Sequence, residues 1–158
     1  INVMEIHIPG FKKLEIKNLV LDFNGTLGND GLLNTTIIES VNILATKLNV
    51  YVLTADTYKM VREQCINLHV TLRIIAENNQ DYTKMQFVKQ LGSDETICIG
   101  NGRNDSLMLQ EAALGIAVIE KEGGAVAAIN SADLVVQGIE NAIELLMKPM
   151  RLVSTLRP

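Results

Sequence analysis

The sequence has no tryptophan, few aromatic residues and no surplus of basic residues. Its formal net charge is −4, which argues against a general nucleic-acid binder, because no excess of lysine and arginine is present to meet phosphates. It also lacks an apolar run of the roughly 18 residues that a membrane-spanning helix needs; the longest, 112–119, is interrupted by Gly115. We therefore expect neither nucleic acid nor a membrane as a partner.

Cysteine is also scarce. Cys65 and Cys98 both lie in apolar stretches, so we expect them to be reduced core residues of a cytoplasmic protein, and neither a metal pair nor a disulfide. The 158 residues have the length of one domain with a sizeable core. We expect 1–158 to form a single domain.

Short apolar runs alternate with amphipathic segments along most of the chain, which predicts an α/β fold: a three-layer, doubly wound (Rossmann-like) parallel sheet with helices on both faces. A hairpin formed by 3–8 and 14–16 precedes it. The expected strands are 19–21, 50–53, 70–76, 96–99, 116–119 and 134–136. The first two expected helices contain 37–48, capped by Asn34, and 61–68. A third begins at Asp81 or Thr83 and ends at Gly92, and a fourth is capped by Asn104. A short helix follows Gly124, and the last contains 139–147.

The apolar run 19–21 ends abruptly in Asp22, and Gly25 permits the positive backbone angles of a tight turn. A carboxylate at the carboxyl end of a central strand, beside a turn whose amides can form an anion nest, suits phosphoryl chemistry. Aspartate can also act as a covalent nucleophile. The alternative is that Asp22 merely ends the strand and caps the turn.

Polar clusters follow three of the expected strands, at 22–26, 54–57 and 100–105, and Lys84 lies at a helix start. Each has its own plain explanation: Thr54 could cap a helix, Lys84 could be solvated, and 100–102 could be a turn. Because parallel strands end at one edge of the sheet, their joint placement favours a single crevice that holds a nucleophile, a hydroxyl, a cation and a second acid.

At this point the chain resembles the haloacid dehalogenase superfamily of phosphohydrolases and, within it, the phosphorylation domain of P-type ATPases. Asp-Phe-Asn-Gly-Thr at 22–26 is similar to that family's Asp-Lys-Thr-Gly-Thr, and Leu-Thr-Ala-Asp-Thr at 53–57 to its Leu-Thr-Gly-Asp-Asn. Lys84 matches its conserved lysine. Gly-Asn-Gly-Arg-Asn-Asp at 100–105 is similar to its Gly-Asp-Gly-x-Asn-Asp. The resemblance spans about 19–136 and implies a haloacid dehalogenase-like core.

The resemblance implies a magnesium-dependent phosphohydrolase that works through an aspartyl-phosphate at Asp22. Oxygen ligands for Mg²⁺ would come from Asp22, the backbone carbonyl of Asn24, and Asn101 or Asp105. The catalytic residues it implies are Asp22, Asn24, Thr54 and Lys84. The phosphate-binding residues it implies are Phe23, Asn24, Gly25, Thr26, Thr54, Ala55, Lys84 and Asn104.

Three departures from the family qualify this expectation. Position 24 is Asn where most soluble phosphatases of the superfamily have an acid/base Asp, so we expect slow turnover, and Asp56 is a candidate substitute. Position 101 is Asn where the ATPases have Asp, so we expect Asp105 to contribute more to metal binding. Nothing between the motifs is long enough for a cap domain, so an open crevice suits a large substrate, or a second subunit must provide a lid.

Two functions from different classes remain open. The leading one is a phosphatase acting on a phosphorylated small molecule or a phosphoprotein; the other is a catalytically weakened phosphate- or metal-binding regulatory protein. The tail, 148–158, combines basic and apolar residues. Either it folds back on its own domain, or it makes the contact of a homo-oligomer and helps to cover an active-site mouth, its own or a neighbour's.

Overall fold

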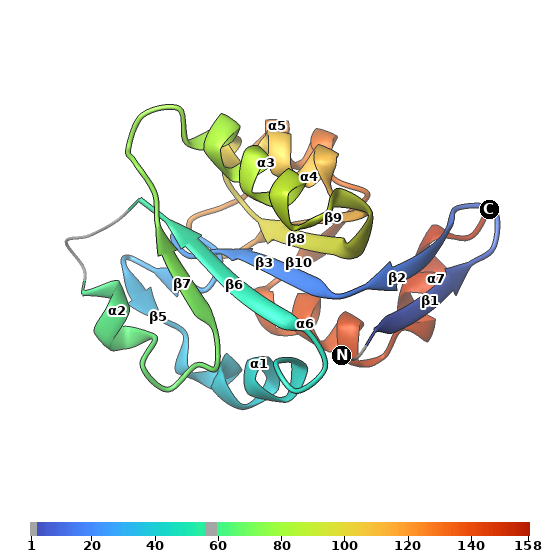
Figure 1. Cartoon of the computed structure of the whole chain (residues 1–158), viewed down its shortest axis with the longest axis horizontal. Coiled ribbons are helices and arrows are strands. Elements are labelled where there is room, and N and C mark those ends of the chain that lie inside the picture. The colour runs from blue at the N-terminus through green and yellow to red at the C-terminus, as the bar shows by residue number, and fades with distance from the viewer. Residues whose placement is uncertain (1–2, 56–59) are drawn as a thin grey trace.

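A computed structural model describes residues 3–55 and 60–158. Its centre is a six-stranded parallel sheet with the strand order β10-β9-β8-β3-β6-β7 (Figure 1). Within this sheet, the first strand in the sequence is β3, near the centre. The chain then forms β6 and β7 toward one edge, and afterwards crosses to β8, β9 and β10 on the other side of β3. The sheet strands are β3 (Asn18–Asp22), β6 (Asn49–Thr54), β7 (Thr71–Ile74), β8 (Thr96–Gly100), β9 (Leu114–Ile119) and β10 (Leu134–Gln137).

Helices cover both faces of the sheet, so the predicted three-layer, doubly wound α/β fold is confirmed (Figure 1). One face carries α3 (Gln80–Leu91), α4 (Ser106–Glu111) and α5 (Val126–Ser131); the other carries α1 (Ile38–Leu44), α2 (Val61–Gln64) and α6 (Ile139–Met147). The 3₁₀ turns are η1 (Thr35–Ile37), η2 (Ser93–Glu95) and η3 (Arg103–Asp105), and a small hairpin, β4 (Gly28–Asn29) and β5 (Leu32–Leu33), follows the Asp22 turn.

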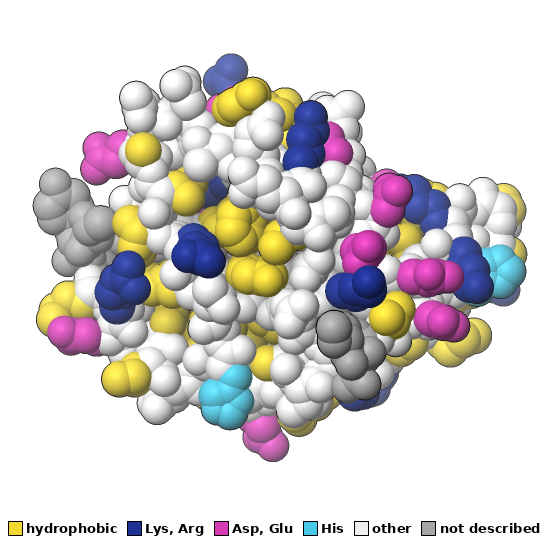
Figure 2. Space-filling model, in the orientation of Figure 1, with side chains coloured by type: hydrophobic (Ala, Val, Ile, Leu, Met, Phe, Trp, Pro, Cys, Tyr) yellow, Lys and Arg dark blue, Asp and Glu magenta, His cyan; other side chains and the backbone are white. Residues whose placement is uncertain are grey.

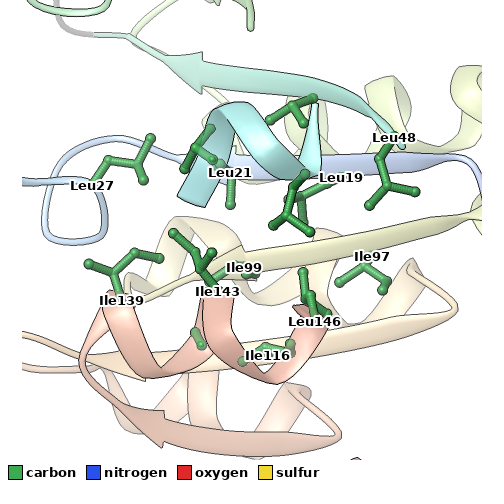
Figure 3. Packing of buried hydrophobic residues seen from close by; sticks show 14 of the residues in the cluster. Leu19, Leu21, Leu27, Leu48, Ile97, Ile99, Ile116, Ile139, Ile143 and Leu146 are labelled. Atoms are coloured by element: carbon green, nitrogen blue, oxygen red, sulfur yellow. The ribbon is translucent and has the colours of Figure 1, made fainter. Parts of the chain in front are cut away.

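The central strands are buried on both faces, which explains their uninterrupted apolar runs. Between the sheet and α6, Leu19 and Leu21 of β3 pack with Ile97 and Ile99 of β8 in the larger core cluster (Figure 3). On the opposite face, Val20 and the other alternate side chains meet α3 and α4 in a second cluster. Since β3 is fixed from both faces, Asp22 at its end is held in one position.

An antiparallel hairpin, β1 (Met4–Ile8) and β2 (Lys12–Ile16), extends from the sheet as predicted. One of its faces is apolar and packs on the C-terminal helix α7 (Met150–Leu156), whose Leu152 is fully buried. Its other face is exposed, and Figure 2 shows charged side chains of both signs gathered over this hairpin.

The tail therefore folds back on its own domain, which was one of the two alternatives. An ion pair between Arg151 and Glu144, 3.2 Å apart, joins α7 to α6. Within the described residues, α7 contributes nothing to the cavity at the carboxyl ends of the strands, so it does not cover its own active-site mouth. A contact with a second copy of the chain stays a prediction.

Most expected elements are present, with two differences that matter for the site. The helix expected to begin at Asp81 or Thr83 begins at Gln80, after Asn79 in a left-handed conformation. Asn104 does not cap α4; its side-chain amide donates instead to the side chain of Gln80, 2.8 Å away. Among residues 3–55 and 60–158, no helix is long and apolar enough to cross a membrane.

Candidate active site

Asp22 lies at the carboxyl end of β3, at the point where the chain crosses from one half of the sheet to the other. Its neighbours in the sheet, β6 and β8, end beside it in Thr54 and Gly100. In open α/β sheets, ligands bind in the crevice that forms at such a switch point. Asp22 is only 5% exposed, so its carboxylate sits at the inner end of this crevice.

The turn after Asp22 requires a glycine. Gly25 has a φ of +79°, and a Cβ atom there would come within 2.2 Å of the Asn101 side chain. The N–H groups of Gly25 and Thr26 donate within the turn, to the carbonyls of Gly28 and Phe23. These two amides are therefore not available for the anion nest that the sequence suggested.

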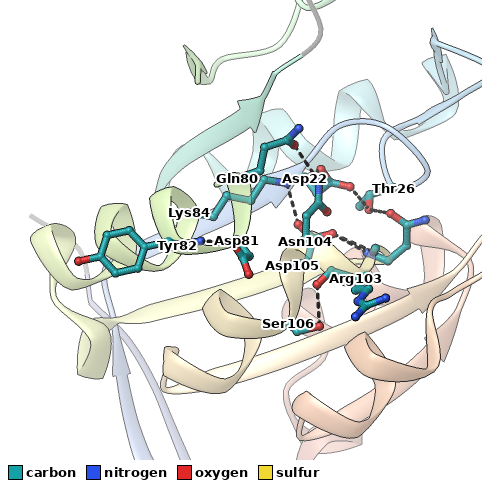
Figure 4. A network of polar contacts seen from close by, with 12 residues as sticks. Asp22, Thr26, Gln80, Asp81, Tyr82, Lys84, Arg103, Asn104, Asp105 and Ser106 are labelled. Carbon is teal, nitrogen blue, oxygen red and sulfur yellow. Dashed lines mark hydrogen bonds and ion pairs between the residues drawn. The ribbon is translucent and has the colours of Figure 1, made fainter. Parts of the chain in front are cut away.

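Lys84 forms the centre of the buried polar network in Figure 4. It shares one face of α3 with Val88, one turn further along, and both side chains are buried. Its Nζ lies 2.9 Å from Oδ1 of Asp22 and 2.7 Å from Oδ1 of Asp105. The lysine is 1% exposed and Asp105 is fully buried, so one buried cation pairs with two buried carboxylates.

These contacts shift the pKa values of both partners. Burial, and then the nearby Asp105 carboxylate, raise the pKa of Asp22 to about 7, against the opposing effects of Lys84 and Thr26. Burial alone would lower the pKa of Lys84, but Asp22 and Asp105 outweigh it, and the net shift is upward. The lysine therefore stays charged, while the raised pKa of Asp22 reflects its burial beside a second carboxylate.

Asp105 is fully engaged by the protein. While Oδ1 contacts Lys84, Oδ2 accepts the backbone N–H groups of Asn101, at 3.1 Å, and Gly102, at 2.9 Å. It lies behind Gly100, where a Cβ atom would come within 2.5 Å of its carboxylate. Asp105 thus fixes the 100–105 loop and orients Lys84.

Asn101 faces the crevice. Its Nδ2 donates to the carbonyl of Gly123, 3.1 Å away, which leaves Oδ1 directed toward the Asp22 turn. The hydroxyl of Thr26 lies 3.0 Å from Oδ2 of Asp22 and 3.3 Å from Oδ1 of Asn101. Because a hydroxyl has one proton, it serves these two acceptors in turn. The carboxylate and the amide oxygen therefore lie on the same side of the turn.

A cavity of about 590 Å³ opens above Asp22. It brings together seven of the predicted residues: Asp22, Asn24, Thr54, Ala55, Lys84, Asn101 and Asn104. Four do not line it: Phe23, whose side chain is buried in the core, Gly25, Thr26 and Asp105. A role for Phe23 is thus limited to its backbone. Asp56 and Thr57, named from the sequence, lie outside the described residues.

Three residues of this cavity were not predicted as site residues: Glu77, Gln80 and Gly102. Glu77 and Gln80 follow β7, so they too lie at a strand's carboxyl end, and that position was the available signal. Among the described residues, no three His, Cys, Asp or Glu side chains are grouped to hold a metal ion. A cation here would need amide and carbonyl oxygens as well as carboxylates.

Comparisons with solved structures place this geometry in a known fold. The chain is similar to 3-deoxy-D-manno-octulosonate 8-phosphate phosphatase from Moraxella catarrhalis, determined with magnesium, phosphate and the sugar acid, at a TM-score of 0.69 and 17% identity over 90% of this chain and 94% of that one. A cobalt-bound phosphatase for the same substrate from Haemophilus influenzae gives 0.68 and 15%, covering 90% and 94%. BT1666 of Bacteroides thetaiotaomicron, from a study of haloacid dehalogenase superfamily phosphatases, gives 0.59 and 13%, covering 88% and 95%.

The chain thus has the fold of the haloacid dehalogenase superfamily, and the resemblance seen in its motifs is confirmed at that level. Among curated proteins, it is 39% identical over 83 residues to the uncharacterized protein MJ0073 of Methanocaldococcus jannaschii, and this match covers 50% of this chain and 89% of that protein. The chain belongs to the same family as MJ0073. No family model matches the chain.

Proposed function

We propose that the protein is a magnesium-dependent phosphatase that forms an aspartyl-phosphate on Asp22. The observation that carries this proposal is the buried Lys84, held between Asp22 and Asp105 at the inner end of an open cavity. A lysine in this position offsets the charge that the nucleophile and a phosphoryl group share. The similar fold of phosphatases supports the same conclusion.

The residues present fit a magnesium ion. Two buried carboxylates face a single lysine, so a second cation would offset the remaining negative charge. We assign the ion to the carboxylate of Asp22, the backbone carbonyl of Asn24 and Oδ1 of Asn101, all oxygen donors of the kind Mg²⁺ prefers. When bound, Mg²⁺ supplies charge stabilisation for the transferring phosphoryl group.

The sequence suggested that Asp105 contributes more than Asn101 to metal binding, and the geometry supports the opposite assignment. Both its oxygens already accept hydrogen bonds, and it does not line the cavity, whereas Asn101 does. We therefore assign direct contact with the metal to Asn101. Asp105 holds the loop and the lysine in place around it.

In the reaction, a carboxylate oxygen of Asp22 attacks phosphorus while the bond from phosphorus to the leaving oxygen breaks. Thr54 and Lys84 contact the phosphoryl oxygens, with Ala55 and Asn104 at the wall of the same cavity. A water molecule then attacks the aspartyl-phosphate and releases phosphate. Asn24 cannot carry a proton in either step, so turnover depends on another group or is slow.

A phosphorylated small molecule is the substrate class that we favour, since the similar phosphatases act on 3-deoxy-D-manno-octulosonate 8-phosphate. A phosphoprotein is the second option for a cavity this open. A panel of phosphorylated metabolites and phosphopeptides, assayed with Mg²⁺ and with a chelator, tests the proposal. Release of phosphate that requires Mg²⁺ and is lost in Asp22→Asn supports it.

The rival function is a regulatory protein that binds phosphate or metal without turnover. The observations that favour it are two amides: Asn24, where most soluble phosphatases of the superfamily have Asp, and Asn101, where the ATPases have Asp. The intact Asp22–Lys84–Asp105 network weighs against it. Binding of phosphate and Mg²⁺ by calorimetry, with no phosphate release from any substrate in the panel, would decide for this function.

A further inference from the structure

A second cavity adjoins the active-site cavity. The outer cavity, of about 390 Å³, lies at the start of α3 and is lined by Glu77, Asn79, Gln80, Asp81, Arg103 and Asn104. Glu77, Gln80 and Asn104 also line the active-site cavity. These three residues therefore mark the boundary between the place where phosphorus sits and the space outside it.

The leaving oxygen of a phosphate ester belongs at that boundary. In phosphoryl transfer the attacking and leaving oxygens lie roughly in line, on opposite sides of phosphorus. Asp22 attacks from the buried inner end of the cavity, because it is only 5% exposed. The leaving oxygen then points outward, to the shared residues and the outer cavity.

Of the three boundary residues, only Glu77 has a side chain that exchanges a proton. Gln80 and Asn104 carry amides. In the part of the chain that the structure describes, Glu77 has no ion pair, and the other carboxylate near the phosphoryl site, Asp105, is fully buried with both oxygens engaged. Asp81 lines only the outer cavity and not the active-site cavity.

Two hydrogen bonds fix the Glu77 segment over the cavity. Nε2 of Gln80 donates to the backbone carbonyl of Glu77, 2.9 Å away, and Nδ2 of Asn104 donates to Oε1 of the same Gln80, 2.8 Å away. Figure 4 shows Gln80 and Asn104 reaching toward each other beside Asp22 and Lys84. Gln80 thus ties the Glu77 segment to the 100–105 loop.

We infer that Glu77 is the catalytic acid and base of this site, in the role that Asn24 cannot fill; this inference rests on the proposed phosphatase function. In the first step, Asp22 bonds to phosphorus, the bond from phosphorus to the leaving oxygen breaks, and the Glu77 carboxyl gives its proton to that oxygen. In the second step, water attacks the aspartyl-phosphate, the Glu77 carboxylate takes the proton of the water, and Asp22 is released as a carboxylate. Both residues return to their starting states.

The test compares two substrates whose leaving groups differ in their need for a proton. Wild type, Glu77→Gln and the control Glu39→Gln, an exposed glutamate on α1, are assayed with Mg²⁺ on glycerol phosphate and on p-nitrophenyl phosphate. We expect Glu77→Gln to lower kcat/KM for glycerol phosphate by about 10²- to 10⁴-fold, the usual contribution of general acid–base catalysis. For p-nitrophenyl phosphate kcat/KM stays near wild type, and a burst of nitrophenolate precedes slow turnover.

A merely structural role of Glu77 would lower both kcat/KM values together, and that result overturns the inference, as does an unchanged Glu77→Gln enzyme. A selective loss on glycerol phosphate in Asp56→Asn, and not in Glu77→Gln, also overturns it and moves the role to Asp56. Wild type that hydrolyses neither substrate contradicts the phosphatase proposal itself, which is a different failure.

Discussion

The ammonium group of Lys84 lies 2.7 Å from a carboxylate oxygen of Asp105, and both groups are buried. The same ammonium lies 2.9 Å from Asp22. Removing one partner of a buried ion pair leaves a charge without compensation, which typically costs about 3–5 kcal/mol. The network that we assign to catalysis is therefore also a structural element of the crevice.

We predict that Lys84→Met lowers the free energy of unfolding by about 3–5 kcal/mol and removes phosphatase activity. The methionine keeps most of the length of the side chain but leaves Asp22 and Asp105 facing each other without a cation. The control is Lys89→Met, an exposed position on the same helix, for which we expect a change below about 0.5 kcal/mol. Urea denaturation of both variants measures the difference, and equal stabilities would contradict the prediction.

The raised pKa of Asp22 predicts a pH-dependent stability. The pKa of Asp22 is about 7 in the folded protein and near 3.8 in the unfolded chain. At pH values between these two, the folded state therefore holds a proton that the unfolded state has lost. Without metal, the contribution of Asp22 to stability is therefore lost as pH rises from about 4 to about 7. A shift of this size corresponds to a free energy on the order of 4 kcal/mol.

Asp22→Asn removes this dependence. In the presence of a chelator, the variant should gain stability relative to wild type by that amount between pH 4 and pH 7. Denaturation curves at several pH values, with the exposed Asp94→Asn as the control, measure the gain. A difference between variant and wild type that is the same at every pH would show that the Asp22 pKa is not raised.

Restoring the missing acid is the third prediction. We expect Asn24→Asp to raise kcat/KM for an alkyl phosphate more than for p-nitrophenyl phosphate, because only the alkoxide needs a proton as it leaves. The factor should be larger in the Glu77→Gln background, where no other group supplies the proton. Equal factors for both substrates would mean that position 24 does not act on the leaving group.

The fourth prediction separates the two metal assignments. Asn101→Ala should raise the Mg²⁺ concentration for half-maximal activity by about 100-fold or more, since it removes a direct ligand. Asp105→Asn should raise it by roughly 10- to 100-fold, as expected of a residue that supports the ligands. Titration of Mg²⁺ by activity and by calorimetry gives both values. The reverse order would make Asp105 the direct ligand.

Much of the fold could be predicted because its strands are buried on both faces, which leaves uninterrupted apolar runs such as that of β3. The inner residues of the site followed from the same rule. Asp22 and Thr54 end neighbouring strands, and Lys84 shares a helix face with Val88. The strand ends therefore predict that Asp22 and Thr54 meet at the centre of the crevice, and the family resemblance adds Lys84.

The mouth of the crevice could not be predicted, because it depends on contacts between distant segments. Gln80 is the first residue of α3, and its side chain accepts a hydrogen bond from the amide of the distant Asn104. The Asn104 amide makes this contact and does not cap α4. The same holds for α7, whose Leu152 is buried in the core cluster that also holds the apolar residues of the hairpin. Neither partner is visible in the local pattern.

The central claim is that Asp22 becomes phosphorylated. Its most direct test is a crystal structure of the protein with Mg²⁺ and beryllium fluoride, which mimics an aspartyl-phosphate. We predict a fluoride complex bonded to a carboxylate oxygen of Asp22, with Lys84 and Thr54 in contact with its fluorines and Mg²⁺ on the Asn24 carbonyl and Asn101. A complex bonded to another residue, or an Asp22→Asn protein that hydrolyses substrate as fast as wild type, would contradict the account.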